Sequence, residues 1–254
     1  MPLEDFLPTQ VYIILLVLSR LGGTMMLIPG IGETFVPVQY RLILTVGLSL
    51  VVAPLVADTI PLAPTAPELA RLVFFELVIG LYFGIVARIL LLTMDTAGQI
   101  IAMNAGLANA QIFNPAIATQ GSLPGFFLLN IATLLLLITD LHHLLIRALI
   151  DSYSLFPPGA PLPLADFADA ISTVISHSFQ LAVQLSSPFI VLGLLFYLVM
   201  GIMARLMPQL QIFFVALPIQ VVMGLVVLSL VLSGAMLVFL EYYGANIGSY
   251  VIPR

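Results

Sequence analysis

Charged and glycine residues recur every four positions in one apolar stretch, at Glu76, Gly80, Gly84 and Arg88. This spacing places all four along one face of a helix. The glycines allow another helix to approach closely, and a carboxylate or guanidinium inside a membrane needs a partner or water. With Asp95 further along, the pattern predicts a helix-packing seam set by ion pairs, formed either between subunits or within this chain.

A second cluster, Asp140, His142 and His143, has residue types that suit metal binding or acid–base chemistry. Adjacent helical residues point about 100° apart, however, and no further histidine or carboxylate motif completes a site. The chain also lacks cysteine and lysine, which excludes thiolate nucleophiles, Schiff bases and P-loop nucleotide hydrolysis. We therefore expect a protein that is not an enzyme and has no catalytic residue, metal or cofactor.

The elements that carry these residues are predicted from composition. The chain has 254 residues, of which 61% are hydrophobic and 7% charged, whereas a soluble domain carries about a quarter charged residues. This composition predicts an all-α integral membrane protein with about six long hydrophobic helices, partly kinked at Pro188 and Pro218. The predicted spans are residues 11–29, 42–57, 69–93, 125–150, 172–203 and 211–243.

Two segments between the spans differ in character. The proline-rich linker "FPPGAPLPL", residues 156–164, predicts a boundary between N-terminal helices in 1–155 and a C-terminal hairpin in 165–254. Residues 94–124 are rich in amides and glycine, and irregular backbone at membrane depth is tolerated only inside protein or along an aqueous cavity. The second segment is interpreted as a plug-like loop or as an ordinary exposed loop. Its candidate residues are Asn104, Gly106, Asn109, Gln111, Phe113, Asn114, Pro115 and Gln120.

Polar residues form a stripe along one face of the predicted helix over 166–187, and beyond Asp169 the stripe carries no charge. It indicates either a wet lining for something that slides past or a helix that lies at an interface or bonds to a neighbour. The stripe comprises Asp166, Asp169, Ser172, Thr173, Ser176, Gln180, Gln184 and Ser187.

The stretch "MARLMPQLQIF", residues 203–213, contains Arg205, which is the only Asp, Glu, Lys or Arg between Asp169 and Glu241. Nearby methionines share one helix face, which predicts a compliant gasket or ordinary core packing. They are Met200, Met203 and Met207.

The segment "GIMARLMPQLQIFFVALPIQ", residues 201–220, resembles the signature of the FliR or T-type export-gate subunit family of type III secretion systems. The resemblance continues through residues 76–107 and 140–159. It implies helical hairpins that pack into a hetero-oligomeric gate with the P-type and Q-type subunits (FliP, FliQ), near the B-type switch protein (FlhB). Such a gate passes unfolded flagellar proteins across the bacterial inner membrane at the flagellar basal body, partly above the bilayer plane.

The same resemblance implies roles for particular residues. The loop at 106–122 corresponds to a plug that helps to close the pore, and the turn at 204–210 corresponds to a hairpin tip at the pore entrance. The tip residues are Arg205, Pro208, Gln209, Gln211 and Pro218. Three alternatives stay open: the equivalent subunit of a virulence injectisome, an intramembrane enzyme, and a small secondary transporter in which Glu76, Arg88 and Asp95 bind ions. With a net charge of −5 and no basic patch, nucleic acid is not expected as a partner.

Overall fold

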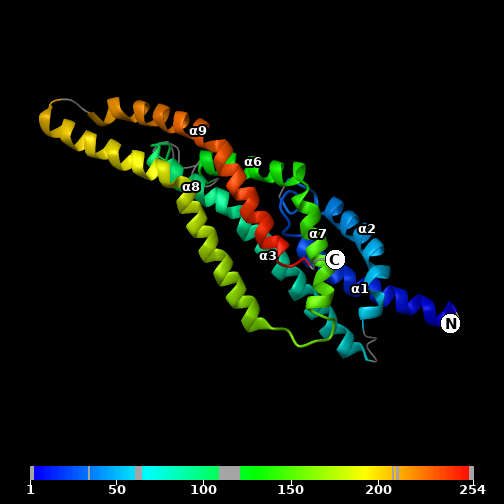
Figure 1. Ribbon diagram of the computed structural model, residues 1–254. Helices are drawn as coiled ribbons and strands as arrows, with labels where there is room; N and C mark the ends of the chain where they lie inside the picture. The colour runs from blue at the N-terminus through cyan, green and yellow to red at the C-terminus, as the bar shows by residue number, and fades with distance from the viewer. Residues whose placement is uncertain are drawn as a thin grey trace. The chain divides into compact units, whose positions relative to one another are not determined.

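The structure, a computed structural model, describes residues 3–33, 35–60, 65–108, 121–207, 209 and 212–251, without the side chains of 3–8 and 212–215. Every regular element in these ranges is helical (Figure 1), which confirms the all-α class. The helices are α1 (Leu3–Met25), α2 (Val38–Val56), the 3₁₀ helix η1 (Ala57–Thr59), α3 (Ala66–Asn104), α6 (Leu123–Ile138), α7 (Leu141–Leu155), α8 (Leu164–Leu206) and α9 (Ile212–Gly248).

The chain packs as two units that each combine distant segments. Unit 1 contains residues 1–90, 136–174 and 243–254, and unit 2 contains 91–135 and 175–242. The proline-rich linker 156–164 therefore lies inside unit 1, and the expected division into N-terminal and C-terminal halves does not coincide with the packing.

Helix α3 extends further than the sequence predicts, because it continues from the expected end at residue 93 to Asn104. The first part of the amide-rich segment is therefore helical. Its polar side chains bond within the helix: Gln99 donates to Asp95 Oδ2 (2.8 Å), and Asn104 donates to the carbonyl of Ile100 (2.8 Å). The Gln99–Asp95 pair is of the i to i+4 kind that stabilises a helix. Gly106 then takes a left-handed conformation (φ 74°) just beyond the helix end.

The expected span over 125–150 is not one continuous helix, because the chain breaks into α6 and α7 with a bend of 70°. The break falls at Thr139 and Asp140, and Asp140 adopts a left-handed φ of 59°. Aspartate tolerates this conformation better than most residues do. The break creates a corner at which Asp140 precedes the first turn of α7.

The parts of α8 and α9 that belong to unit 2, residues 175–206 and 212–242, run antiparallel as a hairpin (Figure 1). Gln220 Nε2 donates to the Tyr197 hydroxyl (3.4 Å) near the turn. Near the far end, the hydroxyl oxygens of Ser178 and Tyr242 are 3.2 Å apart. Both helices continue through their internal prolines, Pro188 and Pro218. Long apolar helices tolerate proline where neighbours or local adjustments satisfy the freed backbone carbonyl.

Four helices in the described residues are long and apolar enough to cross a membrane, or five spans if the bent α6–α7 pair counts as one. The sequence predicts about six. The difference arises because α1 contributes only the shorter apolar stretch Thr9–Met25. Most of the apolar part of α3 is buried within the chain, whereas few residues in the corresponding parts of α8 and α9 are. The faces of α8 and α9 thus need cover from lipid or from other subunits.

Candidate functional site

A buried ion pair is the centre of unit 1. Arg20 on α1 is 0% exposed, Glu76 on α3 is 1% exposed, and Arg20 Nε lies 2.5 Å from Glu76 Oε2. Arg20 also donates to Ser152 Oγ and to the carbonyl of Phe156, both at 2.9 Å. Its guanidinium carbon lies 3.8 Å from the ring centre of Tyr153. We call this set of five residues the charge node, and it ties α1, α3 and α7 together.

Glycines bring α1 and α3 close enough to form this node. A Cβ at Gly80 would overlap the carbonyl oxygen of Arg20, and one at Gly23 would lie 2.9 Å from the carbonyl oxygen of Leu77. In the same place Thr24 donates across the helices to the carbonyl of Gly80 (2.8 Å). Because the backbones touch, larger side chains at these positions would push the helices apart.

The second charge of the predicted seam is also paired within the chain. Arg88 makes an ion pair with Glu33, which lies between α1 and α2. Arg41 on α2 donates to the carbonyls of Val36 and Glu33 in the same connection. Together with the Arg20–Glu76 pair, this arrangement supports the alternative in which the seam packs within one chain. The partners Arg20 and Glu33 were missed because periodicity on α3 carries no information about them.

Unit 2 is held by amides rather than by ion pairs. The Gln220 side chain, 3% exposed, donates to the backbone carbonyl of Asn104 (2.8 Å). Gly106 fits against this amide, because a Cβ there would lie 2.9 Å from Gln220 Oε1. Gly193 fits against the Asn104 side chain in the same way, with its added Cβ 2.7 Å from Oδ1. We call Asn104, Gly106, Gly193 and Gln220 the amide node; it holds the C-terminal end of α3 against α8 and α9.

The last residue of the predicted seam, Asp95, lies in unit 2 beside a second close approach. Gly98 on α3 and Gly125 on α6 meet backbone to backbone. A Cβ added at Gly125 would lie 2.5 Å from Asp95 Oδ1, and the Gly125 amide donates to Ser122 Oγ (3.0 Å). Asp95 therefore belongs to a helix contact of unit 2, separate from the two ion pairs of unit 1.

The candidate hairpin tip lies at the C-terminal end of α8. Arg205 is exposed there, as is Gln209 beyond the helix end. Met203 and Met207 are 42% and 51% exposed, and Met200 is half-buried. The methionines therefore do not belong to the buried core of this chain. Pro208 and Gln211 lie outside the described residues, and Pro218 is exposed on α9.

The polar stripe of α8 is exposed along its whole length: every one of its eight residues from Asp166 to Ser187 faces away from the core of its own unit. The plug-like residues divide in two. Asn104 and Gly106 belong to the amide node, and the others lie outside the described residues: Asn109, Gln111, Phe113, Asn114, Pro115 and Gln120.

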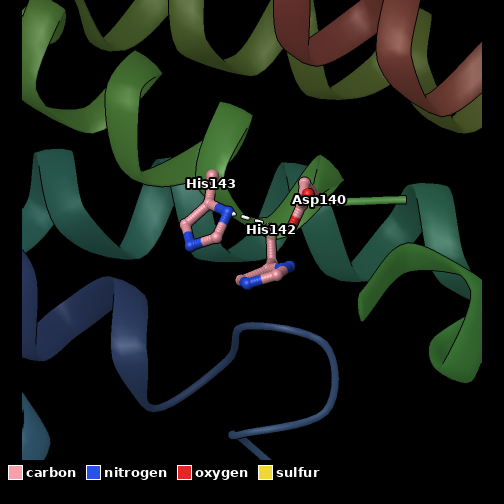
Figure 2. Close-up of side chains that lie close together, drawn as sticks. All are labelled: Asp140, His142 and His143. Carbon is pink, nitrogen blue, oxygen red and sulfur yellow. Dashed lines mark ion pairs between the residues drawn. The ribbon is translucent and has the colours of Figure 1, made fainter. Parts of the chain in front are cut away.

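Asp140, His142 and His143 lie together at the start of α7 (Figure 2). His143 Nδ1 is 3.2 Å from Asp140 Oδ1, and the two histidine ring centres are 4.0 Å apart. One potential ligand atom from each of the three residues lies within 4.8 Å of the others. Adjacent helical histidines are expected to point about 100° apart, yet the two rings lie close together at this corner.

Sequence comparison adds the decisive observation. The family model described as "Bacterial export proteins, family 1" matches residues 11–245. The chain belongs to this family. The matched region covers nearly the whole chain, including the charge node, the amide node and the candidate hairpin tip.

Individual relatives agree with the family 1 match. The chain is 40% identical over 235 residues to the flagellar biosynthetic protein FliR of Caulobacter vibrioides, covering 92% of this chain and 94% of the relative. It is 30% identical over 228 residues to FliR of Aquifex aeolicus, covering 89% and 88%. The secretion system apparatus protein SsaT of Salmonella typhimurium is 29% identical over 163 residues, covering 64% and 62%.

Proposed function

We propose that the chain is a pore-forming subunit of the flagellar type III protein export gate. The gate passes unfolded flagellar proteins across the bacterial inner membrane, and the subunit acts without catalysis. The observation that carries the proposal is the end-to-end similarity to a flagellar relative, 40% identical over 92% of the chain. Membership of a bacterial export family also supports a role in protein export.

The exposed faces of unit 2 support assembly with other subunits. Leu194, Leu198 and Val222 are more than half exposed on α8 and α9, and such apolar faces need lipid or protein cover. The P-type and Q-type gate subunits, FliP and FliQ, and the B-type switch protein FlhB are the proposed neighbours. The uncharged part of the polar stripe suits a surface along which an unfolded chain slides, because it offers hydrogen bonds without fixed charges.

The amide-rich segment that follows the amide node serves as the plug in this proposal. Gln220 and Gly106 fix the point at which the segment leaves α3, so the plug begins from a defined position. The exposed methionines beside Arg205 suit a gasket that adapts to a moving chain. The hairpin tip would then face the cytoplasmic entrance.

A gene deletion tests the flagellar assignment. We expect loss of motility and of filaments with normal growth, and recovery when the gene is supplied in trans. Loss of effector secretion with intact filaments would instead indicate an injectisome subunit, the alternative that the weaker match to SsaT favours. Intact filaments and intact effector secretion together would contradict both.

The transporter alternative has little support from the described charges. Glu76 and Arg88 each have an ion-pair partner in the chain, and Asp95 accepts a hydrogen bond from Gln99. Purification separates the hypotheses: a gate subunit co-purifies with FliP and FliQ, whereas a carrier transports solute alone in liposomes.

Two variants test the local roles. Deleting residues 106–120 should raise ion leakage through the assembled complex, and unchanged conductance would count against a plug.

Arg205→Ala should weaken gate assembly or secretion. Arg71→Ala, which removes another exposed arginine, is the matched control. Normal co-purification and normal export in Arg205→Ala would reject the tip assignment.

A further inference from the structure

The corner between α6 and α7 gathers three metal-ligating side chains that the export function does not use. Asp140 precedes α7 in a left-handed conformation, and His142 and His143 follow in the first turn. Figure 2 shows the Asp140 and His143 side chains turned toward each other. Asp140 and His143 are 74% and 67% exposed, so an ion from solvent can reach them.

The spacing of the ligand atoms suits a single small ion. Ligands that bind Zn²⁺ tetrahedrally at about 2.0–2.1 Å lie roughly 3.3 Å from one another. The 3.2 Å between Asp140 Oδ1 and His143 Nδ1 matches that separation. One potential ligand atom from each of the three residues, His142 included, lies within 4.8 Å of the others, a separation that a side-chain rotation can shorten.

The surroundings of His142 add an outer contact of the kind that metal sites use. Its Nδ1 lies 3.5 Å from the backbone carbonyl oxygen of Leu136, at the long limit of a hydrogen bond. Histidine ligands commonly donate one ring N–H to a carbonyl, which leaves the other nitrogen for the metal. The contact also joins the last turn of α6 to the first turn of α7.

The local electrostatics are compatible with a cation. The N-terminal end of α7 disfavours positive charge, but the Asp140 carboxylate and the C-terminal carbonyls of α6 oppose that effect. The next charged residue along α7, Arg147, pairs with Asp151 (3.9 Å). Two imidazole nitrogens and one carboxylate oxygen favour Zn²⁺ over Mg²⁺ or Ca²⁺, which prefer oxygen ligands.

We propose that Asp140, His142 and His143 bind one divalent transition-metal ion, with Zn²⁺ the best match, and that the ion fastens the corner at residues 136–143. Three protein ligands leave the fourth tetrahedral position to water. This site is independent of the proposed export function, and a separate measurement tests it.

The experiment is a Zn²⁺ titration of the full-length chain in detergent, purified through a tag without histidine. Isothermal titration calorimetry should show one saturable site, and Co²⁺ should give the visible absorption bands of tetrahedral coordination. Since even outer-shell changes cost roughly 10–100-fold in metal affinity, Asp140→Asn and His142→Ala should each weaken Zn²⁺ binding at least about tenfold. Mg²⁺ should produce no saturable signal.

The remaining histidine supplies the matched control, because the chain has three histidines and no cysteine. His177 is exposed on α8, and His177→Ala should bind Zn²⁺ as the unmodified chain does. Circular dichroism checks that the variants keep their helices. Absence of saturable Zn²⁺ binding by the unmodified chain would overturn the proposal, as would equal loss of binding in His177→Ala.

Discussion

Different kinds of contact stabilise the interior of each packing unit. The chain has 12 acidic and seven basic residues, and only Asp95, Arg205 and Glu241 belong to unit 2. All ion pairs between described residues lie in unit 1, with Arg20–Glu76 the most deeply buried. Both units contain close glycine contacts, but unit 2 has the buried amide of Gln220 where unit 1 has ion pairs.

This difference predicts different resistance to change. Separating a buried charge from its partner is expensive, so the charge node fixes the positions of α1, α3 and α7 firmly. A hydrogen bond from a neutral side-chain amide contributes less free energy than a buried ion pair does, and it is more easily replaced by another hydrogen bond. The proposed plug and hairpin tip both belong to the unit with the weaker fastening. A part that must open while its support stays folded is expected to be built in this way.

The largest effect is expected from breaking the charge node. Arg20→Ala or Glu76→Ala leaves a buried, unpaired charge and should lower the free energy of unfolding by about 3–5 kcal/mol. Titration of the purified full-length chain with SDS, followed by circular dichroism, measures this loss. The double variant Arg20→Met/Glu76→Leu should recover much of it, because apolar residues of similar size can replace a buried pair. A double variant as unstable as the single ones would contradict the interpretation.

The next effect tests the close approach of α1 and α3. Gly80→Ala places a methyl group against the backbone of Arg20 and should cost about 1–3 kcal/mol of unfolding free energy, as overpacking does. Gly47→Ala is the matched control on α2, because an added Cβ there meets nothing within 4 Å. The control should be neutral or more stable by roughly 0.5–1 kcal/mol. Equal effects of the two substitutions would show that the contact is not tight.

Sequence periodicity identified the face of α3 but not what it contacts. The spacing of Glu76, Gly80 and Arg88 follows from the helix repeat, which is local. Their partners lie 56 and 55 residues away, at Arg20 and Glu33, and only tertiary packing brings them together. Arg20 itself offered one signal: it is the only charged residue in the apolar stretch 11–29, where a charge requires a partner.

Two predictions about helix ends differ from the structure. One treated polar residues as a sign of a loop, and the other ignored a polar residue within an apolar run. Gln99 and Asn104 lie in the segment interpreted as a loop, yet they belong to α3 and their side chains form hydrogen bonds within it. Conversely, the apolar run 125–150 suggested one span, although Asp140 interrupts it in a left-handed conformation. The second break depends on one residue's backbone, and a window of hydropathy averages over it.

The amide node should respond more mildly than the charge node. Gln220→Met keeps the side-chain volume but leaves the Asn104 carbonyl without this donor, which should cost about 1–2 kcal/mol locally. That corresponds to roughly 5–30-fold faster hydrogen exchange, expected at the Ala105 and Ala108 amides, which bond to Ile101 and Ala102. Gln180→Met, on the exposed face of α8, is the control. Unchanged exchange in Gln220→Met would reject the idea that Gln220 holds the end of α3.

The smallest effect is expected at an exposed pair on the same helix as Glu76. Arg71 and Glu68 are 3.6 Å apart, with side chains 56% and 38% exposed, so Arg71→Ala should cost less than about 1 kcal/mol of unfolding free energy. The dependence on salt concentration distinguishes this exposed ion pair from the buried Arg20–Glu76 pair. Raising NaCl from about 0.1 M to about 1 M shortens the screening length from about 10 Å to about 3 Å. The Arg71→Ala effect should then shrink toward zero, whereas that of Arg20→Ala should persist because no ions reach the charge node. If salt erased both effects alike, Arg20 and Glu76 would have to be accessible to solvent, and the contrast between a firmly charged unit 1 and an amide-held unit 2 would lose its physical basis.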